Sequence, residues 1–370
     1  MVLLDILLYI FVAVVGIQVL YFIFFFGKFA FLKHNKKTPI NIPVSVIICA
    51  KNEAENLKKF LPSVINQDYP NFQIVLINDA SYDDTFKVME EFARKHNNIK
   101  LVNVINNEAF WANKKYALTL GIKAAKHNHL LFTDADCKPL SKHWITEMSS
   151  CFSETKSIVL GYGAYSKIKN SHLNKLIRYE TFLTAVQYFS FAKLGIPYMG
   201  VGRNLAYTKG TFFNGNGFMS HMYIRSGDDD LFINQTATAK NTDICFSPES
   251  FTESIPKKTF KDWKTQKRRH ITTANHYKAK HKVLLAVFYI SQVLFWVLAM
   301  ALLILLFKWQ FVLALILFRS LAQFIVFYKA SKKLNETDLI FYIPIIEIFL
   351  IGFQLSIFMH NLISKPKHWK

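Results

Sequence analysis

The sequence of 370 residues predicts an α/β domain with a mostly parallel sheet, attached to transmembrane helices at both ends of the chain. Two observations lead to this prediction. Between residues 44 and 134, short apolar segments alternate with amphipathic ones, which is typical of parallel strands covered by helices on both faces. Long apolar segments with few charges precede and follow this region, and hydrophobic residues make up 52% of the chain.

Four apolar segments are long enough to cross a bilayer, for which about 18 residues are needed. The first contains Asp5, the second no charged residue, the third only Arg319 and the fourth only Glu347. For the third and fourth, a re-entrant or interfacial helix is the alternative. The first is too long for a signal peptide and lacks a cleavage site, so we expect an uncleaved anchor. The four segments are Val2–Phe26, Val283–Phe307, Trp309–Tyr328 and Leu339–Ile363.

Lysine residues next to the apolar segments set the expected orientation. Residues 28–37 hold four lysines after the first segment, and residues 278–282 hold three before the second. We therefore expect the segment between them to be cytoplasmic. Residues 330–333 are also basic, which fits a third helix that returns inward. If all four segments crossed, the basic tail 364–370 would lie outside, so the number of C-terminal crossings stays open.

The net charge of +20 and the four cysteines limit the function classes. Much of the positive charge borders apolar segments, so anionic membrane lipids are the expected partner and nucleic acid is not. The cysteines have no metal-binding spacing, and we expect buried free thiols in a reducing compartment. They are Cys49, Cys137, Cys151 and Cys245.

Polar residues collect where the predicted strands end, and in parallel sheets ligands bind beyond those ends. The expected strands are 44–50, 73–79, 101–105 and 129–134, separated by helices over 51–61, 85–95 and 114–125. Some of the polar residues are helix caps, and Asp83 or Asp84 is expected to cap the helix that opens at Thr85. Capping does not explain Asp79 and Asp134, which directly follow apolar strand residues.

Asp134 and Asp136 form the most informative pair in the sequence. If the strand stays extended, their side chains point the same way, and two carboxylates so close repel each other unless a cation intervenes. Mg²⁺ typically takes one or two protein carboxylates together with substrate phosphates. The pair therefore predicts half of a site for a metal ion and a diphosphate. The chain contains neither G-x-G-x-x-G nor a P-loop, which excludes Rossmann dinucleotide and P-loop nucleotide sites.

Three segments resemble the family 2 glycosyltransferases, which have the GT-A fold. They are V-S-V-I-I-C-A-K-N-E-A-E-N-L, I-N-D-A-S-Y-D-D-T and F-T-D-A-D, and the similarity covers roughly residues 41–275. The resemblance implies a nucleotide-sugar donor, with UDP favoured, and Mg²⁺ or Mn²⁺ on Asp136. It also implies which residues bind the donor and which residue lies next to the metal ion. The implied donor-binding residues are Ala50, Asn52, Glu53, Asp79, Lys114, Asp134, Gln266 and Arg269, and Asp134 is placed beside the metal and the ribose or diphosphate.

Two later motifs resemble the family's acceptor and base segments. Residues 198–207 are similar to G-x-N-x-A-Y, which implies that Gly202, Arg203 and Asn204 face the acceptor side. Residues 225–232, R-S-G-D-D-D-L-F, resemble the E-D or D-D base motif. Inverting transfer needs one carboxylate that takes the proton of the acceptor hydroxyl. Asp229 is favoured for this role, with Asp228 as the alternative.

The basic segment 264–270 resembles Q-x-x-R-W through Gln266 and Arg269, but His270 stands where tryptophan is usual. This departure puts the shape of the acceptor channel in question. The implied role of Arg269 is to hold the leaving diphosphate by charge-assisted bonds. Basic residues also alternate with aromatic ones over 256–282, which predicts amphipathic helices at the membrane surface.

The sequence therefore predicts an inverting, metal-dependent glycosyltransferase that acts on a lipid acceptor at the cytoplasmic membrane face. The expected parts are an anchor and linker (1–40), a cytoplasmic GT-A domain (41–255), interfacial helices (256–282) and C-terminal transmembrane helices (283–370). A processive polysaccharide synthase is the alternative within the family. A membrane transporter using Arg319 and Glu347 as pathway residues, or an inactive scaffold, are the alternatives outside it.

Overall fold

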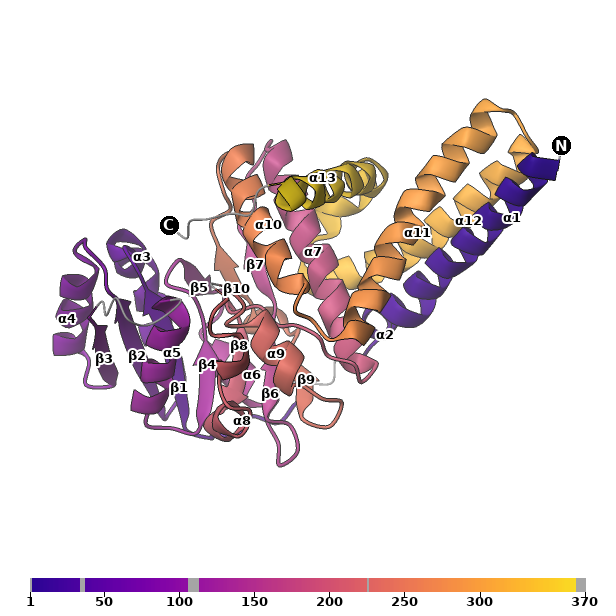
Figure 1. The fold of residues 1–370 in the computed structure, drawn as a ribbon. Helices are drawn as coiled ribbons and strands as arrows, with labels where there is room; N and C mark the ends of the chain where they lie inside the picture. Colours follow the sequence, from indigo (N-terminus) through magenta and orange to yellow (C-terminus); the bar gives the residue numbers. More distant parts are fainter. Residues whose placement is uncertain (1, 34–36, 106–112, 225, 364–370) are drawn as a thin grey trace.

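The computed structural model describes residues 2–33, 37–105, 113–224 and 226–363, which form an α/β domain and a projecting bundle of long helices (Figure 1). The bundle contains α1 (Val2–Leu20), α11 (Ala279–Ile304) and α12 (Trp309–Leu334). The last helix, α13 (Ile343–Ile363), lies beside α7 (His172–Lys193) and α10 (Phe260–Ala274) and also contacts α11.

The main sheet has seven strands in the order β3-β2-β1-β4-β8-β6-β9. Pairing is parallel from β3 to β4 and between β6 and β9, whereas β8 runs antiparallel to both of its neighbours. The strands are β1 (Val44–Ala50), β2 (Phe72–Asp79), β3 (Ile99–Val104), β4 (His129–Phe132), β6 (Ile158–Leu160), β8 (Leu205–Thr208) and β9 (Thr242–Ile244). A second sheet joins β5 (Cys137–Pro139), β10 (Thr252–Ser254) and β7 (Gly163–Tyr165).

Side chains of the central strands alternate between two apolar layers, as the pleat of a sheet requires. On β1, Val46 and Ile48 pack in the layer that includes residues of α3 (Ala54–Ile65) and α4 (Thr85–Lys95). Ile47 packs in the opposite layer with α5 (Asn113–Ala124) and α7. Gly121 lets α5 approach closely, because a Cβ there would lie 2.1 Å from the Ile77 Cδ1 atom.

The prediction of an α/β fold with a mostly parallel sheet and terminal apolar helices is confirmed. The predicted strands correspond to β1 to β4, and the predicted helices to α3 to α5, with ends shifted by a few residues. One local expectation is wrong: β4 ends at Phe132, so residues 133–136 turn instead of extending the strand. The cysteines are free as expected, and three are buried while Cys49 is partly buried.

The shorter elements connect the sheet to its surroundings. They are α2 (Gly27–Ala30), α6 (Trp144–Ser149), α8 (Lys209–Asn214) and α9 (Asp230–Thr236), with short helical turns over Met219–His221, Pro248–Ser250 and Thr337–Tyr342. The side-chain oxygens of Ser171 and Thr259 cap α7 and α10 by accepting from backbone N–H groups, which satisfies donors that a helix start leaves unpaired.

Among the residues that the structure describes, four helices are long and apolar enough to cross a membrane, which indicates an integral membrane protein. The first is longer than predicted, because a π-helical turn over Tyr21–Phe26 joins α1 to α2 and the helix ends at Ala30. The third is also longer, since residues 330–333 belong to α12. Many large apolar side chains on α11 and α12 are exposed in the protein alone, as expected for surfaces that face lipid.

The charged residues inside the apolar helices pair with each other. The Nη1 atom of Arg319 donates to Glu347 Oε2 at 2.9 Å and to Gln323 Oε1 at 2.8 Å. Its Nη2 atom donates to Gln18 Oε1 at 2.8 Å, and Gln292 Nε2 donates to Glu347 Oε1 at 2.8 Å. This buried cluster joins α1, α11, α12 and α13. The charges of Arg319 and Glu347 therefore neutralise each other where these helices pack together.

Candidate active site

The acidic pair predicted from the sequence lies in the turn after β4. Carboxylate oxygens of Asp134 and Asp136 and the Cys137 sulfur all lie within 4.8 Å of one another. Burial raises the pKa of Asp136, and the nearby carboxylates of Asp134 and Glu53 raise it further. Burial and Asp136 also raise the pKa of the Cys137 thiol, which keeps it protonated. The two carboxylates therefore fit a hard divalent cation such as Mg²⁺ or Mn²⁺, whose charge would relieve their repulsion.

Lys114, at the start of α5, bridges the acidic pair to a second acidic segment. Its Nζ atom lies 3.3 Å from Asp134 Oδ1 and 2.9 Å from Asp228 Oδ2. Burial opposes the charge of Lys114, but the carboxylates of Asp134, Asp228 and Asp229 outweigh it and hold the lysine pKa well above its ordinary value. These groups share one pocket. It is lined by Ile47, Cys49, Lys114, Leu118, Phe132, Thr133, Asp134, Gly202, Leu205, Tyr207, Asp228 and Asp229.

Asp229 is held in place at the start of α9. Its Oδ1 atom accepts from the backbone N–H of Asp230 at 2.7 Å, and its Oδ2 atom accepts from the N–H of Gly202 at 2.7 Å. Burial, Asp228 and Asp230 raise the pKa of Asp229 to about 7. Asp228 differs, because the ion pair with Lys114 outweighs burial and lowers its pKa. Two adjacent carboxylates thus divide into a fixed anion and a group that can exchange a proton near neutral pH.

The third carboxylate of this segment, Asp230, joins α9 to the region around α10. It is buried, and its Oδ2 atom accepts hydrogen bonds from the Tyr277 hydroxyl at 2.6 Å and from the Thr273 hydroxyl. The run D-D-D marks Asp230 in the sequence, but its partners lie 43 and 47 residues away and could not be found from the motif. The base segment is therefore anchored to the end of α10.

Lys115 is a second residue that the sequence did not single out. Its side chain is 1% exposed, and its Nζ atom donates to the carbonyl oxygens of His221 at 2.6 Å and Ile224 at 3.0 Å. Burial lowers its pKa to about 8. Lys115 therefore fixes the segment that leads into Asp228 and Asp229. Arg225, the first residue of the predicted base motif, lies outside the described residues.

The predicted nucleotide side gathers at the ends of β1 and β2. Ala50 is the buried last residue of β1, and Asn52 follows it with a left-handed backbone (φ of 56°). The Oδ1 atom of Asn52 accepts from the N–H of Tyr82 at 3.1 Å, which locks the two strand ends together.

Glu53 and Asp79 complete this edge. The N–H of Glu53 donates to Thr85 Oγ1 at 2.8 Å, so the start of α3 is tied to the start of α4. Asp79 ends β2 and is 4% exposed. Burial raises the pKa of Asp79, although Lys51 and Lys114 act in the opposite direction. Asp79 thus lies at the carboxyl end of β2, and its contact with the nucleotide stays a prediction.

The predicted acceptor-side residues are Gly202, Arg203, Asn204 and His270, and of these four Gly202 alone lines the pocket among the described residues. Arg203 lies 4.2 Å over the Tyr165 ring and donates to Ser254 Oγ at 2.6 Å and to the Gly163 carbonyl at 2.9 Å. These contacts bind Arg203 to β7 and β10, next to the acidic pair.

The side chain of Asn204 is fully buried and satisfied by the protein. Its Nδ2 atom donates to the carbonyl oxygens of Tyr162 at 2.9 Å and Ser250 at 2.7 Å, and its Oδ1 atom accepts from Trp144 Nε1 at 3.0 Å. Asn204 therefore supports the wall of the site from behind. The resemblance implied that Asn204 faces the acceptor side, but its amide group points into the core.

The helix α10 carries the predicted Gln266, Arg269 and His270. The Nε2 atom of Gln266 lies 3.5 Å from the Tyr165 hydroxyl, which links α10 to β7. Arg269 is close enough to Asp228, Asp134 and Asp229 for their charges to favour its guanidinium form, although burial dominates and lowers its pKa. His270 is exposed. The structure thus brings Arg269 to the acidic cluster.

These features define a glycosyltransferase of the GT-A fold: a mixed, mostly parallel sheet with an acidic pair at the end of β4 and a second acidic segment across the pocket. The chain belongs to glycosyltransferase family 2. The model of glycosyl transferase family 2 matches residues 45–223, and the model of glycosyl transferase family group 2 matches residues 165–353.

Individual relatives match shorter segments. The chain is 34% identical over 93 residues to a poly-beta-1,6-N-acetyl-D-glucosamine synthase of Staphylococcus epidermidis, covering 25% of this chain and 21% of that protein. It is 32% identical over 93 residues to a cholesterol galactosyltransferase of Borreliella burgdorferi, covering 25% of each. The chain thus spans about a quarter or less of the length of these two relatives.

One solved structure shares the fold over most of the chain. It is a mannosyltransferase from Pyrobaculum calidifontis in complex with GDP-mannose and Mn²⁺, with a TM-score of 0.58 and 18% sequence identity. The match covers 90% of this chain and 99% of that protein. At this identity the likeness shows the fold alone.

Proposed function

We propose that this protein transfers a sugar, with inversion, from a nucleotide-diphosphate donor to a hydroxyl group of a lipid acceptor at the cytoplasmic membrane face. The observation that carries the proposal is the pocket that Lys114 bridges. It has Asp134 on one side, next to Asp136, and Asp228 and Asp229 on the other. One acidic pair suits a metal-bound diphosphate, and the other contains a carboxyl group that titrates near neutral pH.

Asp229 is the proposed base, because it is held by Gly202 and carries no lysine partner of its own in the described ion pairs. It takes the proton of the acceptor hydroxyl, and the oxygen attacks the anomeric carbon from the face opposite the leaving diphosphate. A single displacement of this kind inverts the configuration and needs no covalent enzyme intermediate. Asp228 is the weaker candidate, since its ion pair with Lys114 lowers its pKa and its basicity.

The leaving diphosphate is matched by positive charge. Lys114 and Arg269 lie near the acidic cluster and are the proposed partners of the diphosphate oxygens. Mg²⁺ or Mn²⁺ bound by Asp134 and Asp136 would neutralise further charge on the departing nucleotide. Ala50, Asn52 and Glu53 border the proposed nucleotide site, and Asp79 is the proposed contact of the base.

The donor is proposed to be a UDP-sugar, on the resemblance at Asp79, although the fold neighbour was solved with GDP-mannose. A screen of the purified protein across UDP- and GDP-sugars, with and without Mn²⁺, tests the proposal. We expect release of the nucleotide diphosphate from one donor class only when Mn²⁺ is present. Release that does not need a divalent cation would contradict the role of Asp134 and Asp136.

A lipid acceptor is favoured because apolar helices with many exposed large apolar side chains adjoin the α/β domain, and an acceptor dissolved in the bilayer would lie next to them. The relatives include both kinds of enzyme, a polysaccharide synthase and a cholesterol galactosyltransferase. Product length under excess donor separates the two. We expect one added sugar per lipid, whereas a ladder of long chains would favour the processive synthase.

The proposed cytoplasmic side rests on the lysines of residues 28–37 and 278–282, which flank the α/β domain. The transporter alternative loses support, because Arg319 and Glu347 pair with each other in the helix packing. It would regain support if Arg319→Leu abolished activity in a folded protein while Asp229→Asn did not. The scaffold alternative predicts that no nucleotide sugar binds at all, which the same screen measures.

A further inference from the structure

We infer that α13 does not cross the membrane, but lies along its surface with both ends on the side of the α/β domain. Length and composition alone permit a crossing, since 21 residues of helix are about 31 Å long and the segment is apolar. However, the contacts at the two ends of the helix indicate that both ends lie on the same side of the membrane. The inference rests on the chain being a membrane protein and is independent of the proposed reaction.

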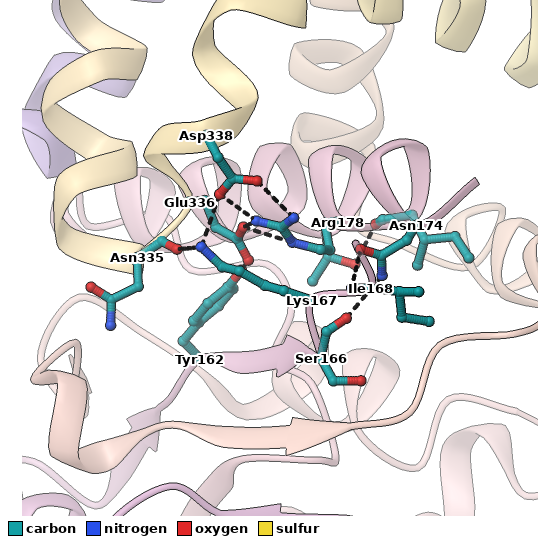
Figure 2. A network of polar contacts seen from close by, with 11 residues as sticks. Tyr162, Ser166, Lys167, Ile168, Asn174, Arg178, Asn335, Glu336 and Asp338 are labelled. Carbon is teal, nitrogen blue, oxygen red and sulfur yellow. Dashed lines mark hydrogen bonds and ion pairs between the residues drawn. The ribbon is translucent and has the colours of Figure 1, made fainter. Parts of the chain in front are cut away.

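The approach to α13 is fixed to α7 by a buried ion network (Figure 2). The Nε atom of Arg178 donates to Glu336 Oε2 at 2.9 Å, and its Nη1 and Nη2 atoms donate to the two carboxylate oxygens of Asp338 at 2.8 and 2.7 Å. Lys167 Nζ donates to Asp338 Oδ1 at 2.8 Å, and the Tyr162 hydroxyl donates to Glu336 Oε1 at 3.2 Å. The side chains of Arg178 and Glu336 are each 3% exposed.

This network fixes the side of the membrane on which α13 begins. Arg178 belongs to α7, and Tyr162 and Lys167 flank β7, so all three partners belong to the α/β domain. Glu336 and Asp338 lie at the start of the helical turn Thr337–Tyr342, which leads into α13. Because the partners of both carboxylates belong to the α/β domain, the start of the segment lies at the level of that domain.

The far end of α13 returns to the same domain. Arg268 Nε donates to Asn361 Oδ1 at 2.9 Å, and Asn361 Nδ2 donates to the Arg268 carbonyl at 3.1 Å. Further back along both helices, the Trp263 and Phe353 rings stack with their centroids 4.4 Å apart. The two helices therefore run side by side, and Figure 1 shows α13 next to α10 and away from the tip of the bundle.

The partner helix α10 cannot be inside the bilayer. Residues 260–274 include five Lys and Arg residues, and Gln266 and Arg269 reach β7 and the acidic cluster of the site. A helix that crosses the hydrocarbon has its ends about 30 Å apart on opposite faces. The ends of α13 instead contact α7 and α10, two helices packed on one domain. Between these ends, the first half of α13 also contacts the bundle. Glu347 accepts hydrogen bonds from Arg319 and Gln292, and the Ile351 carbonyl accepts one from the Tyr289 hydroxyl at 3.0 Å.

The outward face of α13 is apolar and fits lipid. Its exposed large apolar side chains are Ile345, Ile348, Phe349, Leu355, Phe358, Met359, Leu362 and Ile363, and the polar Ser356 and His360 are also exposed. Large apolar side chains are exposed on α11 and α12 as well, and we infer that the outward face of α13 is covered by the boundary between lipid headgroups and acyl chains. The basic tail 364–370 then follows on the same side as the other lysine clusters, in agreement with the charge rule. Three helices cross, and α13 supports α10 at the membrane surface.

Protease protection of short cleavable epitopes tests this topology in the full-length chain. One epitope follows Lys370, a second is placed at Lys240 in an exposed turn of the α/β domain, and a third at Leu306 between α11 and α12. We expect cleavage of the first two from the same side in vesicles of known orientation, and of the third only from the opposite side. Cleavage of the C-terminal epitope together with the Leu306 epitope would overturn the inference.

Cross-linking between α10 and α13 provides a second measurement that does not depend on activity. Cysteines at Arg268 and Asn361 are expected to be joined by a short bifunctional maleimide in native membranes, because these side chains are in contact. The pair Arg268→Cys and Leu306→Cys serves as the matched control. Equal cross-linking of both pairs, or none of the first pair in folded protein, would contradict the proposed placement.

Discussion

Replacing Asp229 by asparagine is expected to abolish transfer while changing how stability depends on pH. The pKa of Asp229 is raised from 3.8 to about 7 in the folded protein. This rise of about three units means that folding makes ionisation of the carboxyl group roughly 4 kcal/mol less favourable. Because the folded pKa lies above the unfolded one, native stability falls as pH rises from about 4 to about 7. The asparagine variant lacks this loss of stability.

The variant also loses one hydrogen bond, because its amide NH₂ must face the N–H of either Gly202 or Asp230. This costs about 1–3 kcal/mol at every pH. We therefore expect Asp229→Asn to be less stable than the natural protein at pH 4–5 and more stable by about 1–3 kcal/mol at pH 8. The transfer rate should fall by about 10²–10⁴-fold if Asp229 is the general base.

Thermal unfolding in detergent at pH 5 and pH 8, together with the rate of sugar transfer, measures both effects. Asp68→Asn is the matched control, since Asp68 is exposed and lies outside the pocket. Two results would refute the reasoning. One is a stability difference between Asp229→Asn and the natural protein that does not change sign with pH. The other is a folded variant that still transfers sugar at a normal rate.

Three further variants test other parts of the site. Asp136→Asn removes one of two metal-binding carboxylates, so calorimetric titration should show donor affinity that no longer rises with Mn²⁺. Lys115→Met leaves two buried carbonyl oxygens without their charged donor, so unfolding free energy should fall by about 3 kcal/mol and transfer with it, whereas Lys123→Met on the same helix should change neither. Gly202→Ala places a Cβ 3.3 Å from the Asp229 carboxylate, so kcat should fall about tenfold with unchanged donor affinity; an unchanged kcat would contradict the proposed contact.

The first half of the α/β domain could be predicted because its signals are local. Each of β1 to β4 contains an apolar run, and the patterns that predict the strand and the neighbouring helix lie within about 20 residues of each other in the sequence. The strands β6, β7, β9 and β10 have three residues each and gain their stability from distant partners, such as Thr252 paired with Pro139. No periodicity exists over so few residues, so these strands and the second sheet were not foreseen.

The candidate site shows the same division between local and distant information. Motifs marked Asp134, Asp136 and Asp229, because their residue types occur at fixed spacing in the sequence. Motifs do not tell where a side chain points, so the burial of Asn204 behind the site was not evident. The anchoring of Asp230 by Tyr277 depends on the packing of α9 against the end of α10, which only the structure shows.

The paired Arg319 and Glu347 also bear on how the protein enters the membrane. A lone arginine or carboxylate near the middle of a helix raises the free energy of membrane insertion by roughly 3 kcal/mol. The translocon is therefore expected to insert α12 inefficiently when no other helix is present. Within α12 the arginine guanidinium bonds only to the neutral Gln323, whereas its carboxylate partner Glu347 comes later in the chain and Gln18 comes earlier. Biogenesis therefore favours holding the nascent α1 beside the translocon until the chain through α13 has been synthesised. Truncation before Glu347 should then yield a product that quality-control proteases degrade.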